Sequence, residues 1–228
     1  MCQKSVVRYT SLTHSKSAAL GLGEVSMKEK ALNMEKICIG FNGIPVLKDI
    51  DFSLDKGEVC GLVGKNGAGK STLLKIIQGL YHAGSGKVEI FGADTTKEIS
   101  DKSYGLVGMI FQELSLIPEM SVLENLFLNN EMKARGMINV REEKRKAAEF
   151  MQKYGVHISV DEKVKNLGSA DKQMVEICKA ILKQKKILLM DEPTASLDNE
   201  QADKFYRMVK QLKEEGISII LITHHLQE

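Results

Sequence analysis

Apolar and polar residues alternate with a period of two along residues 34–39 and 46–54. This period is typical of strands that bury one face. Asn42 and Gly43 lie between the two stretches, and this dipeptide favours the tight turn of a β-hairpin. Continuous apolar runs predict further strands, as in a sheet that is covered on both faces. These strands are expected within residues 58–63, 105–111, 186–193 and 218–223, and residues 84–92 read as a turn followed by a strand.

Other segments have the apolar spacing of helices, namely residues 71–77, 121–132, 140–154 and 174–182. In residues 140–154, Ala147, Phe150 and Met151 share one side and charged residues occupy the other. Strands and helices therefore mix along the chain, which predicts an α/β fold. The region from about residue 115 to 183 is expected to be a helical lobe inserted between strands.

The composition is that of an ordinary globular chain, with 228 residues, 43% hydrophobic residues and a net charge of +2. This charge gives no reason to expect nucleic acid as a partner. The four cysteines have no metal or redox spacing, which fits reduced, buried thiols. No apolar run approaches the roughly 20 residues of a spanning helix, so we expect any membrane link to go through a partner. Residues 1–30 lack lasting periodicity, which predicts a flexible extension before a domain at residues 31–228.

Residues 64–72 match G-x-x-x-x-G-K-[ST], the pattern of a phosphate-binding loop. Glycines in this loop permit dihedrals that let backbone N–H groups wrap a phosphate. The lysine places its ammonium against the β- and γ-phosphates, and the following serine offers a hydroxyl to Mg²⁺. A glycine-rich turn without a ligand is the alternative. The predicted binding residues are Gly64, Lys65, Asn66, Gly67, Ala68, Gly69, Lys70, Ser71 and Thr72.

Two carboxylates, Asp191 and Glu192, follow an apolar run at the place where open α/β sheets bind ligands. Asp191 can hold Mg²⁺, and Glu192 can orient and deprotonate an attacking water. An acidic turn before Pro193 is the structural alternative. His224 stands at the end of the last apolar run, where either a structural role or a contact to a γ-phosphate is open.

Together these motifs resemble the nucleotide-binding domain of ATP-binding-cassette (ABC) proteins. The resemblance rests on the phosphate loop, Gln112 at the end of a strand, and residues 187–192, 195–198 and 223–224, in this order. It covers the chain from about residue 34 to its last residue. The finer pattern is similar to the N-terminal cassette of bacterial monosaccharide importers of the ribose, galactose and xylose type. The stretches that carry this finer likeness are residues 67–75, 111–113, 116–128 and 173–177.

The resemblance implies a P-loop NTPase fold, with a RecA-like core around a mostly parallel sheet, an N-terminal antiparallel β subdomain and an inserted α-helical subdomain. It also implies a role for each matching residue. Phe41 would stack on adenine, and Gln112 would sense both Mg²⁺ and the attacking water. Asp191 would serve the metal, Glu192 would be the general base, and His224 would contact the γ-phosphate.

Two departures from the family pattern change the expectation. The family signature reads Leu-Ser-Gly-Gly-Gln, but Gly168 lacks the hydroxyl and Ala170 adds a methyl group at the matching positions. We therefore expect the chain to bind its own ATP well and to serve a partner's ATP poorly. Asp198 would lie on the loop that faces this partner. The chain also ends at Glu228, shortly after the histidine, so we expect an incomplete C-terminal region and no second cassette.

The implied function is ATP binding and hydrolysis with Mg²⁺ that powers transport of a small solute, a monosaccharide, across the cytoplasmic membrane. The implied partners are a second ABC cassette, transmembrane permease subunits and, indirectly, a solute-binding protein, with no nucleic acid. The location would be peripheral, on the cytoplasmic side of the membrane. Two alternatives remain: a soluble ABC ATPase of the translation or repair type, and a nucleotide-binding half-site with little hydrolysis of its own.

Overall fold

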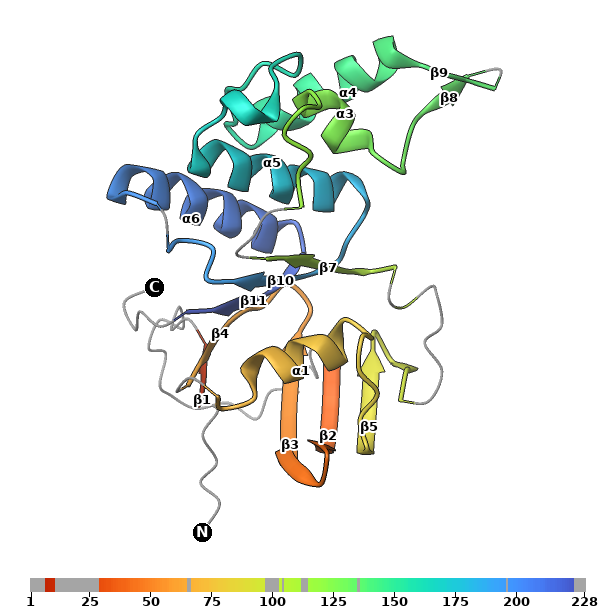
Figure 1. The fold of residues 1–228 in the computed structure, drawn as a ribbon, viewed down its shortest axis with the longest axis vertical. Coiled ribbons are helices and arrows are strands. Elements are labelled where there is room, and N and C mark those ends of the chain that lie inside the picture. Colours follow the sequence, from red (N-terminus) through yellow and green to blue (C-terminus); the bar gives the residue numbers. More distant parts are fainter. Residues whose placement is uncertain are drawn as a thin grey trace, which may run out of the picture.

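A computed structural model gives the fold in three layers, with an antiparallel sheet, a central parallel sheet and a group of helices stacked on one another (Figure 1). The structure describes residues 7–10 (backbone only), 29–64, 67–96, 103, 105–111, 115–134, 136–195 and 197–223. Four of the predicted site residues lie outside these ranges. They are Lys65, Asn66, Gln112 and His224.

The central sheet has the strand order β1-β4-β11-β10-β7. Its parallel strands are β4 (Val59–Val63), β7 (Val107–Ile110), β10 (Ile187–Asp191) and β11 (Ser218–Ile222). Every residue of β11, and every residue of β10 before Asp191, is buried. The continuous apolar runs therefore predicted these strands correctly, because a strand covered on both faces has no solvent side to alternate with.

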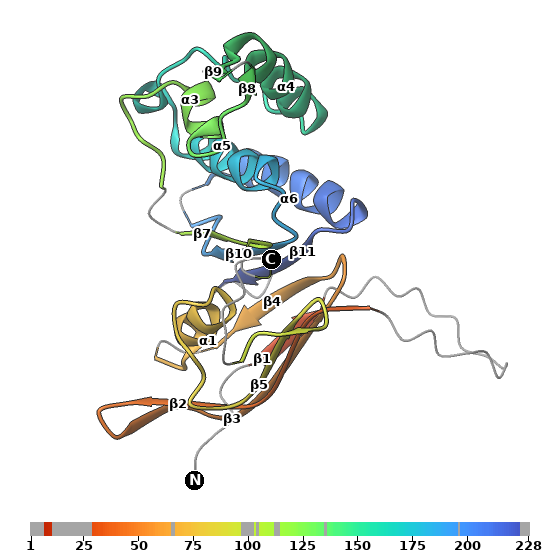
Figure 2. The same cartoon turned by 90° about the vertical axis from the view of Figure 1, so that its right-hand side faces the viewer.

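Two cores lie on opposite faces of this sheet. Ile187, Leu189 and the strand residues in register with them pack toward α1 (Lys70–Ile77) and the antiparallel sheet. Leu188 and Met190 pack toward the helices on the other side. Figure 2 shows α1 between the two sheets, with the helical layer beyond the central sheet. The alternation of side chains along one strand thus supplies both cores at once.

The antiparallel sheet has the order β3-β2-β5-β6 and contains the predicted hairpin. Its strands are β2 (Lys30–Phe41), β3 (Ile44–Asp55), β5 (Ser85–Ile90) and β6 (Ala93–Asp94). Asn42 and Gly43 both have positive φ, at 51° and 80°. These are the dihedrals that the tight hairpin turn requires, which confirms the turn.

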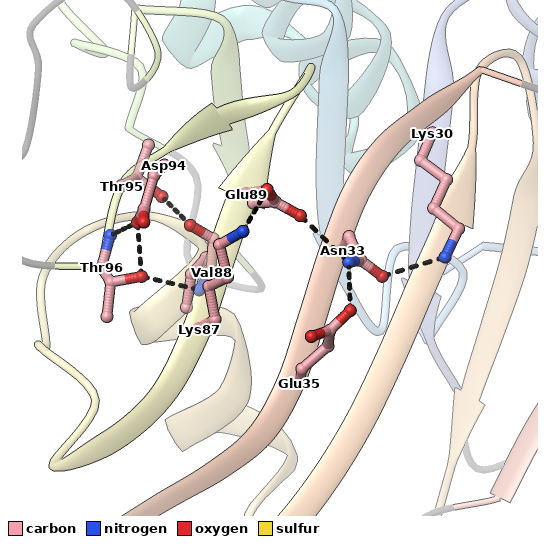
Figure 3. Close-up of polar contacts among 9 residues, drawn as sticks. All are labelled: Lys30, Asn33, Glu35, Lys87, Val88, Glu89, Asp94, Thr95 and Thr96. Atoms are coloured by element: carbon pink, nitrogen blue, oxygen red, sulfur yellow. Dashed lines mark hydrogen bonds and ion pairs between the residues drawn. The ribbon is translucent and has the colours of Figure 1, made fainter.

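One face of the antiparallel sheet carries polar side chains linked across strands (Figure 3). The Asn33 amide donates to Glu35 at 2.9 Å and to Glu89 at 3.1 Å, and Lys87 pairs with Glu89 at 2.7 Å. Neighbouring residues such as Leu32 and Met34 point the other way and are buried. This one-sided burial accounts for the period of two in the sequence.

The helical layer contains α3 (Val122–Phe127), α4 (Val140–Lys153), the 3₁₀ turn η1 (Val164–Asn166), α5 (Ser169–Leu182) and α6 (Asn199–Glu214). The prediction of a helix through residue 132 was wrong beyond Phe127. Leu128 leaves helical dihedrals and Asn129 has a φ of 58°. The chain then forms the short hairpin of β8 (Lys133–Ala134) and β9 (Met137–Ile138). The helix α6 was not predicted, and α5 begins five residues before the predicted start at residue 174.

The first thirty residues are not uniformly without structure, so the expectation of a flexible extension does not hold for all of them. Residues Val7–Thr10 form β1, which pairs antiparallel with β4, and Lys30 already belongs to β2. The reason is that β4 would otherwise present its unpaired backbone groups at the edge of the central sheet. Pairing of this kind depends on backbone groups and leaves little trace in the side-chain pattern.

Two further expectations can be compared with the described residues. Cys38, Cys60 and Cys178 carry free thiols, and burial raises the pKa of the Cys178 thiol to about 12. None of the described helices combines the length and apolar character that crossing a bilayer would need.

Candidate functional site

The carboxyl ends of three parallel strands meet at one edge of the central sheet. In the strand register, Leu62 of β4 and Asp191 of β10 both lie opposite Ile222 of β11. The segments that follow these strands therefore emerge side by side. They are the loop that begins at Gly64 and the turn that begins at Glu192. This edge is where open α/β sheets bind their ligands.

The loop after β4 has a backbone that only glycine adopts easily. Gly67 and Gly69 have φ values of 78° and 90°, in the left-handed region. A Cβ on Gly69 would also lie 2.5 Å from Leu47 Cδ2 and 3.4 Å from the Val46 carbonyl oxygen. The loop and β3 are thus packed too closely for a side chain at Gly69.

The loop delivers Lys70 and the start of α1 into the site. Lys70 is 7% exposed, and its ammonium donates to the Gly64 carbonyl oxygen at 2.5 Å, so it spans the mouth of the loop. The first N–H groups of α1 have no partner within the helix, and together with the helix dipole they favour an anion. The predicted sequence of strand, glycine loop and helix is confirmed.

A pocket of about 400 Å³ joins the loop to the strand ends. Its lining combines cationic and N–H donors from the loop with two carboxylates from the end of β10. The lining residues are Val46, Gly67, Ala68, Gly69, Lys70, Ser71, Thr72, Asp191, Glu192 and Ile222. The sequence reasoning missed Val46 and Ile222. Their signal was only that each lies in a predicted strand next to a predicted site segment.

Glu192 is held in the pocket by an unusual backbone. Its φ is 48°, which is strained for a residue with a Cβ, and its N–H donates to the Ile222 carbonyl oxygen at 3.0 Å. Its own carbonyl oxygen accepts from the Ala195 N–H at 3.2 Å, and Pro193 beside it is buried. Both bonds fix the turn, so the carboxylate keeps its place beside the phosphate loop.

The oxygen donors of the pocket suit a hard divalent cation. Ser71 and Asp191 supply a hydroxyl and a carboxylate, the ligand types that Mg²⁺ prefers alongside water and phosphate oxygens. Within the described residues of the chain there is no group of three or more His, Cys, Asp or Glu that could hold a metal by itself. The donor set therefore fits a cation that is shared with a phosphate ligand.

Comparison with known proteins identifies the family. The model of the ABC transporter family matches residues 47–195, well over half of the chain. The chain belongs to the ABC transporter family. The matched stretch begins in β3, includes the whole phosphate loop and the helical layer through α5, and ends just after Glu192.

Curated relatives of this cassette carry the names of sugar importers. It is 40% identical to the ribose import ATP-binding protein RbsA 1 of Streptomyces avermitilis, over 90% of this chain and 39% of the relative. It is 41% identical to a ribose import ATP-binding protein of Hahella chejuensis, over 86% of this chain and 40% of the relative. It is 38% identical to the galactofuranose transporter ATP-binding protein YtfR of Escherichia coli K12, over 88% and 40% respectively. The chain thus spans about two fifths of the length of the curated relatives that it matches.

Solved structures share the fold of this cassette. The ADP conformation of an ATP-binding cassette of an ABC transporter has a TM-score of 0.72 at 28% identity, over 86% of this chain and 82% of that one. The cbiO1 structure from Clostridium perfringens has a TM-score of 0.75 at 25% identity, and the match covers 87% of this chain and 80% of that one. A dimeric bacterial cassette has a TM-score of 0.69 at 26% identity, and the match covers 86% of this chain and 89% of that one. The P-loop NTPase fold expected from the resemblance is confirmed.

The aromatic residue expected to stack on adenine lies outside the lining of the pocket. Phe41 is 41% exposed at the end of β2, and its ring meets the Tyr81 ring edge-on with centroids 5.2 Å apart. Lys75 lies 5.2 Å from the centroid of the Tyr81 ring. Stacking of a base on Phe41 in this cassette stays a prediction.

The segment that departs from the family signature begins α5. Gly168 is the N-cap of this helix with an ordinary φ of −68°, and it is exposed together with Ser169. No atom lies within 4 Å of the place where a Cβ on Gly168 would stand. Asp198, expected on the loop that faces a second cassette, caps α6 by accepting from the Gln201 N–H at 2.8 Å and is also exposed.

Proposed function

We propose that this cassette binds ATP with Mg²⁺ in the 400 Å³ pocket and hydrolyses its terminal phosphoanhydride bond. The observation that carries the proposal is that Lys70 and Glu192 line one pocket although they lie 122 positions apart in the sequence, so a phosphate cradle meets a carboxylate base. Neither group by itself would point to hydrolysis.

Each described residue has a defined task in this proposal. The N–H groups of residues 67–72 and the ammonium of Lys70 hold and orient the phosphates. The Glu192 carboxylate accepts a hydrogen bond from the attacking water and takes its proton as the bond to phosphorus forms. Ser71 and Asp191 would hold the Mg²⁺, which when bound neutralises charge on the phosphate oxygens. Phe41 would contact the adenine. Gln112 and His224, which lie outside the described residues, would contact the attacking water and the γ-phosphate.

We propose further that hydrolysis powers the import of a monosaccharide. The names of the relatives support this reading, since they are ribose and galactofuranose transporters. The cassette would then act at the cytoplasmic side of the membrane, bound to permease subunits, with a solute-binding protein on the far side as an indirect partner.

A groove of about 480 Å³ between α3 and α4 is suited to a permease segment. Its floor includes Leu123 and Phe127, and Ile138 at 54% exposed adds an apolar rim. Acidic side chains, among them Glu124 and Glu131, line the same groove. Hydrogen bonds from the Ser121 backbone and hydroxyl hold the pKa of Glu124 below its ordinary value, so its charge persists. We propose that an amphipathic permease helix with a basic flank binds here.

The other proposed partner is a second cassette. Pairing with it leads to an alternative function, in which this chain is a half-site for ATP. The exposed N-terminus of α5 would approach the ATP of this partner, but Gly168 offers no hydroxyl there. This favours one competent ATP site per pair, built on the phosphate loop of this chain. A half-site that binds ATP and hydrolyses little by itself is therefore the second candidate.

The test is ATP hydrolysis with Mg²⁺ by the purified chain and by Glu192→Gln, over a range of protein concentrations. Turnover that rises with concentration and is lost in the variant is expected. ATP binding without turnover in either protein would favour the half-site, and turnover that persists in the variant would refute Glu192 as the base. Co-purification with permease subunits of a ribose importer, compared with ribosomes, separates the transport function from a soluble one.

A further inference from the structure

The strand β3 contains a β-bulge beside the phosphate loop. In the pairing of β2 with β3, Ile39 lies opposite Leu47, and the next residue of β2, Gly40, lies opposite Pro45. Val46 is therefore one extra residue on β3 at this point of the register. A bulge of this kind bends the strand and changes the direction in which a side chain points, and bulges are frequent next to functional sites.

The bulge brings two neighbouring residues of β3 to the same loop, although neighbours in a regular strand point to opposite faces. Leu47 is 2% exposed, and its Cδ2 would lie 2.5 Å from a Cβ on Gly69. The Val46 carbonyl oxygen would lie 3.4 Å from the same Cβ, and Val46 also lines the pocket. Leu47 is thus buried against the loop, while Val46 borders the space that a ligand would fill.

The pocket has two walls that come from different sheets. Asp191 and Glu192 lie at the end of β10 and Ile222 ends β11, so one wall belongs to the central sheet. Val46 belongs to β3 of the antiparallel sheet and forms part of the other wall. The loop with its phosphate donors leads into α1, which lies between the two sheets (Figure 2). An anion held by the loop therefore has carboxylates on one side and an apolar side chain on the other.

The two walls suit different parts of a nucleotide. The isopropyl group of Val46 carries no charge and forms no hydrogen bond, so burying a phosphate against it would cost free energy without a compensating bond. An uncharged sugar or base can pack there and gains from the removal of apolar surface from water. The wall with Glu192 is where the proposed attack on the γ-phosphate takes place. The phosphate chain then runs from the wall with Glu192 toward the wall with Val46, and the nucleoside follows the last phosphate.

We propose that Val46 is a nucleotide-binding residue that contacts the nucleoside part of ATP where it leaves the phosphate loop. The inference rests on the proposed function, and it adds a contact that makes the pocket favour a nucleoside triphosphate over inorganic triphosphate. The strand leads back from Val46 to Ile44, which lies opposite Phe41 in the register. Ile44 and Phe41 are 68% and 41% exposed, so the surface beyond Val46 is open to the rest of the nucleoside.

The test compares the binding of two ligands that carry the same phosphate chain, ATP and inorganic tripolyphosphate, each titrated calorimetrically with Mg²⁺. Val46→Ala removes two methyl groups from the pocket wall. The control Val160→Ala removes the same groups from another half-buried valine, in the helical layer. We expect Val46→Ala to raise the Kd for ATP about fivefold and to leave the Kd for tripolyphosphate within about twofold of wild type. Val160→Ala should leave both Kd values within about twofold of wild type.

Three outcomes would overturn the inference. They are an unchanged Kd for ATP in Val46→Ala, an equal weakening of ATP and tripolyphosphate in that variant, and an equal weakening of ATP in Val160→Ala. Equal weakening of both ligands would show that Val46 only shapes the phosphate loop. A second variant, Val46→Ile, keeps a branched apolar side chain, and its Kd for ATP should stay within about twofold of wild type; a loss as large as that in Val46→Ala would also contradict the contact.

These binding measurements need no turnover, which separates the inference from the proposed function. If wild type binds ATP without hydrolysing it, the proposed hydrolysis fails and the comparison of the two ligands still decides the role of Val46. If wild type hydrolyses ATP and Val46→Ala binds ATP as wild type does, only the inference fails. A wild-type chain that binds neither ligand would refute both.

Discussion

Four glycine-to-alanine substitutions separate backbone strain from crowding in this cassette. Gly67 has a φ of 78° and open space around its would-be Cβ. Gly69 has a φ of 90° and Leu47 Cδ2 at 2.5 Å. Gly86, in β5, has a φ of 99° and two backbone carbonyl oxygens at 2.5 Å, those of Glu35 and Lys36. Gly168 has an ordinary φ and no neighbour within 4 Å, so it is the matched control.

The expected losses of unfolding free energy follow from these distances. A left-handed alanine costs about 1–2 kcal/mol, partly offset by the lower entropy of the unfolded chain, so Gly67→Ala should lose about 1 kcal/mol. Gly69→Ala also displaces the buried Leu47 side chain and should lose about 3 kcal/mol. Gly86→Ala must push β5 away from β2, and we expect a loss of about 4 kcal/mol. Gly168→Ala should stay within about 0.5 kcal/mol of wild type.

The assay is urea denaturation of the four variants, followed by titration with ATP. Gly67→Ala and Gly69→Ala should also weaken ATP binding, because their backbone N–H groups would turn away from the phosphates. Gly86→Ala should bind ATP normally at temperatures where it stays folded. A Gly86→Ala protein as stable as Gly67→Ala would refute the crowding argument. Unchanged ATP affinity in Gly69→Ala would refute the role of the loop.

Three further outcomes are expected. Asn125 is fully buried and bonds to the backbone of the segment before α3 through both ends of its amide, so Asn125→Leu should cost about 3 kcal/mol in urea unfolding, and a cost below about 1 kcal/mol would contradict this. Burial raises the pKa of Glu215, but hydrogen bonds from Lys153 and Tyr154 outweigh it and the pKa lies below its ordinary value. The loss of unfolding free energy in Glu215→Gln should therefore be complete at pH 7 and become smaller as the pH falls below about 4.3. A loss at pH 3 equal to that at pH 7 would contradict a lowered pKa for Glu215. Gly168→Ser combined with Ala170→Gly should raise turnover by less than about tenfold, or 1.4 kcal/mol, and a larger rise would show that α5 limits hydrolysis.

The strands and the phosphate loop could be predicted because their signals are local. Burial on both faces leaves a continuous apolar run, and the Asn42–Gly43 turn and the loop glycines reflect dihedrals that few residues adopt. The helix α6 also had a local signal that was overlooked. Phe205, Met208, Val209 and Leu212 have helical spacing and are buried, and Asp198 with Gln201 forms a capping box.

Other features depend on contacts between distant segments and left no such signal. The pairing of β1 with β4 uses backbone groups, which any sequence offers. α3 ends at Phe127 and the chain then enters the short strands β8 and β9, a change of structure that the apolar spacing of residues 121–132 does not reveal. The bond from Ser115 to Glu176 joins residues 61 positions apart, and each of them alone resembles an ordinary polar residue on a loop or helix.

The strand order of the central sheet has a consequence for synthesis of the chain. β4, which leads into the phosphate loop, pairs with β11, about 160 residues later. At about 5–20 residues per second, a ribosome needs roughly 8–32 s between the two strands. During that time β4 lacks its parallel neighbour and the pocket lacks one wall. The nucleotide can therefore assist only the last stage of folding, and ATP added during translation should protect the chain from proteolysis only after β11 has emerged.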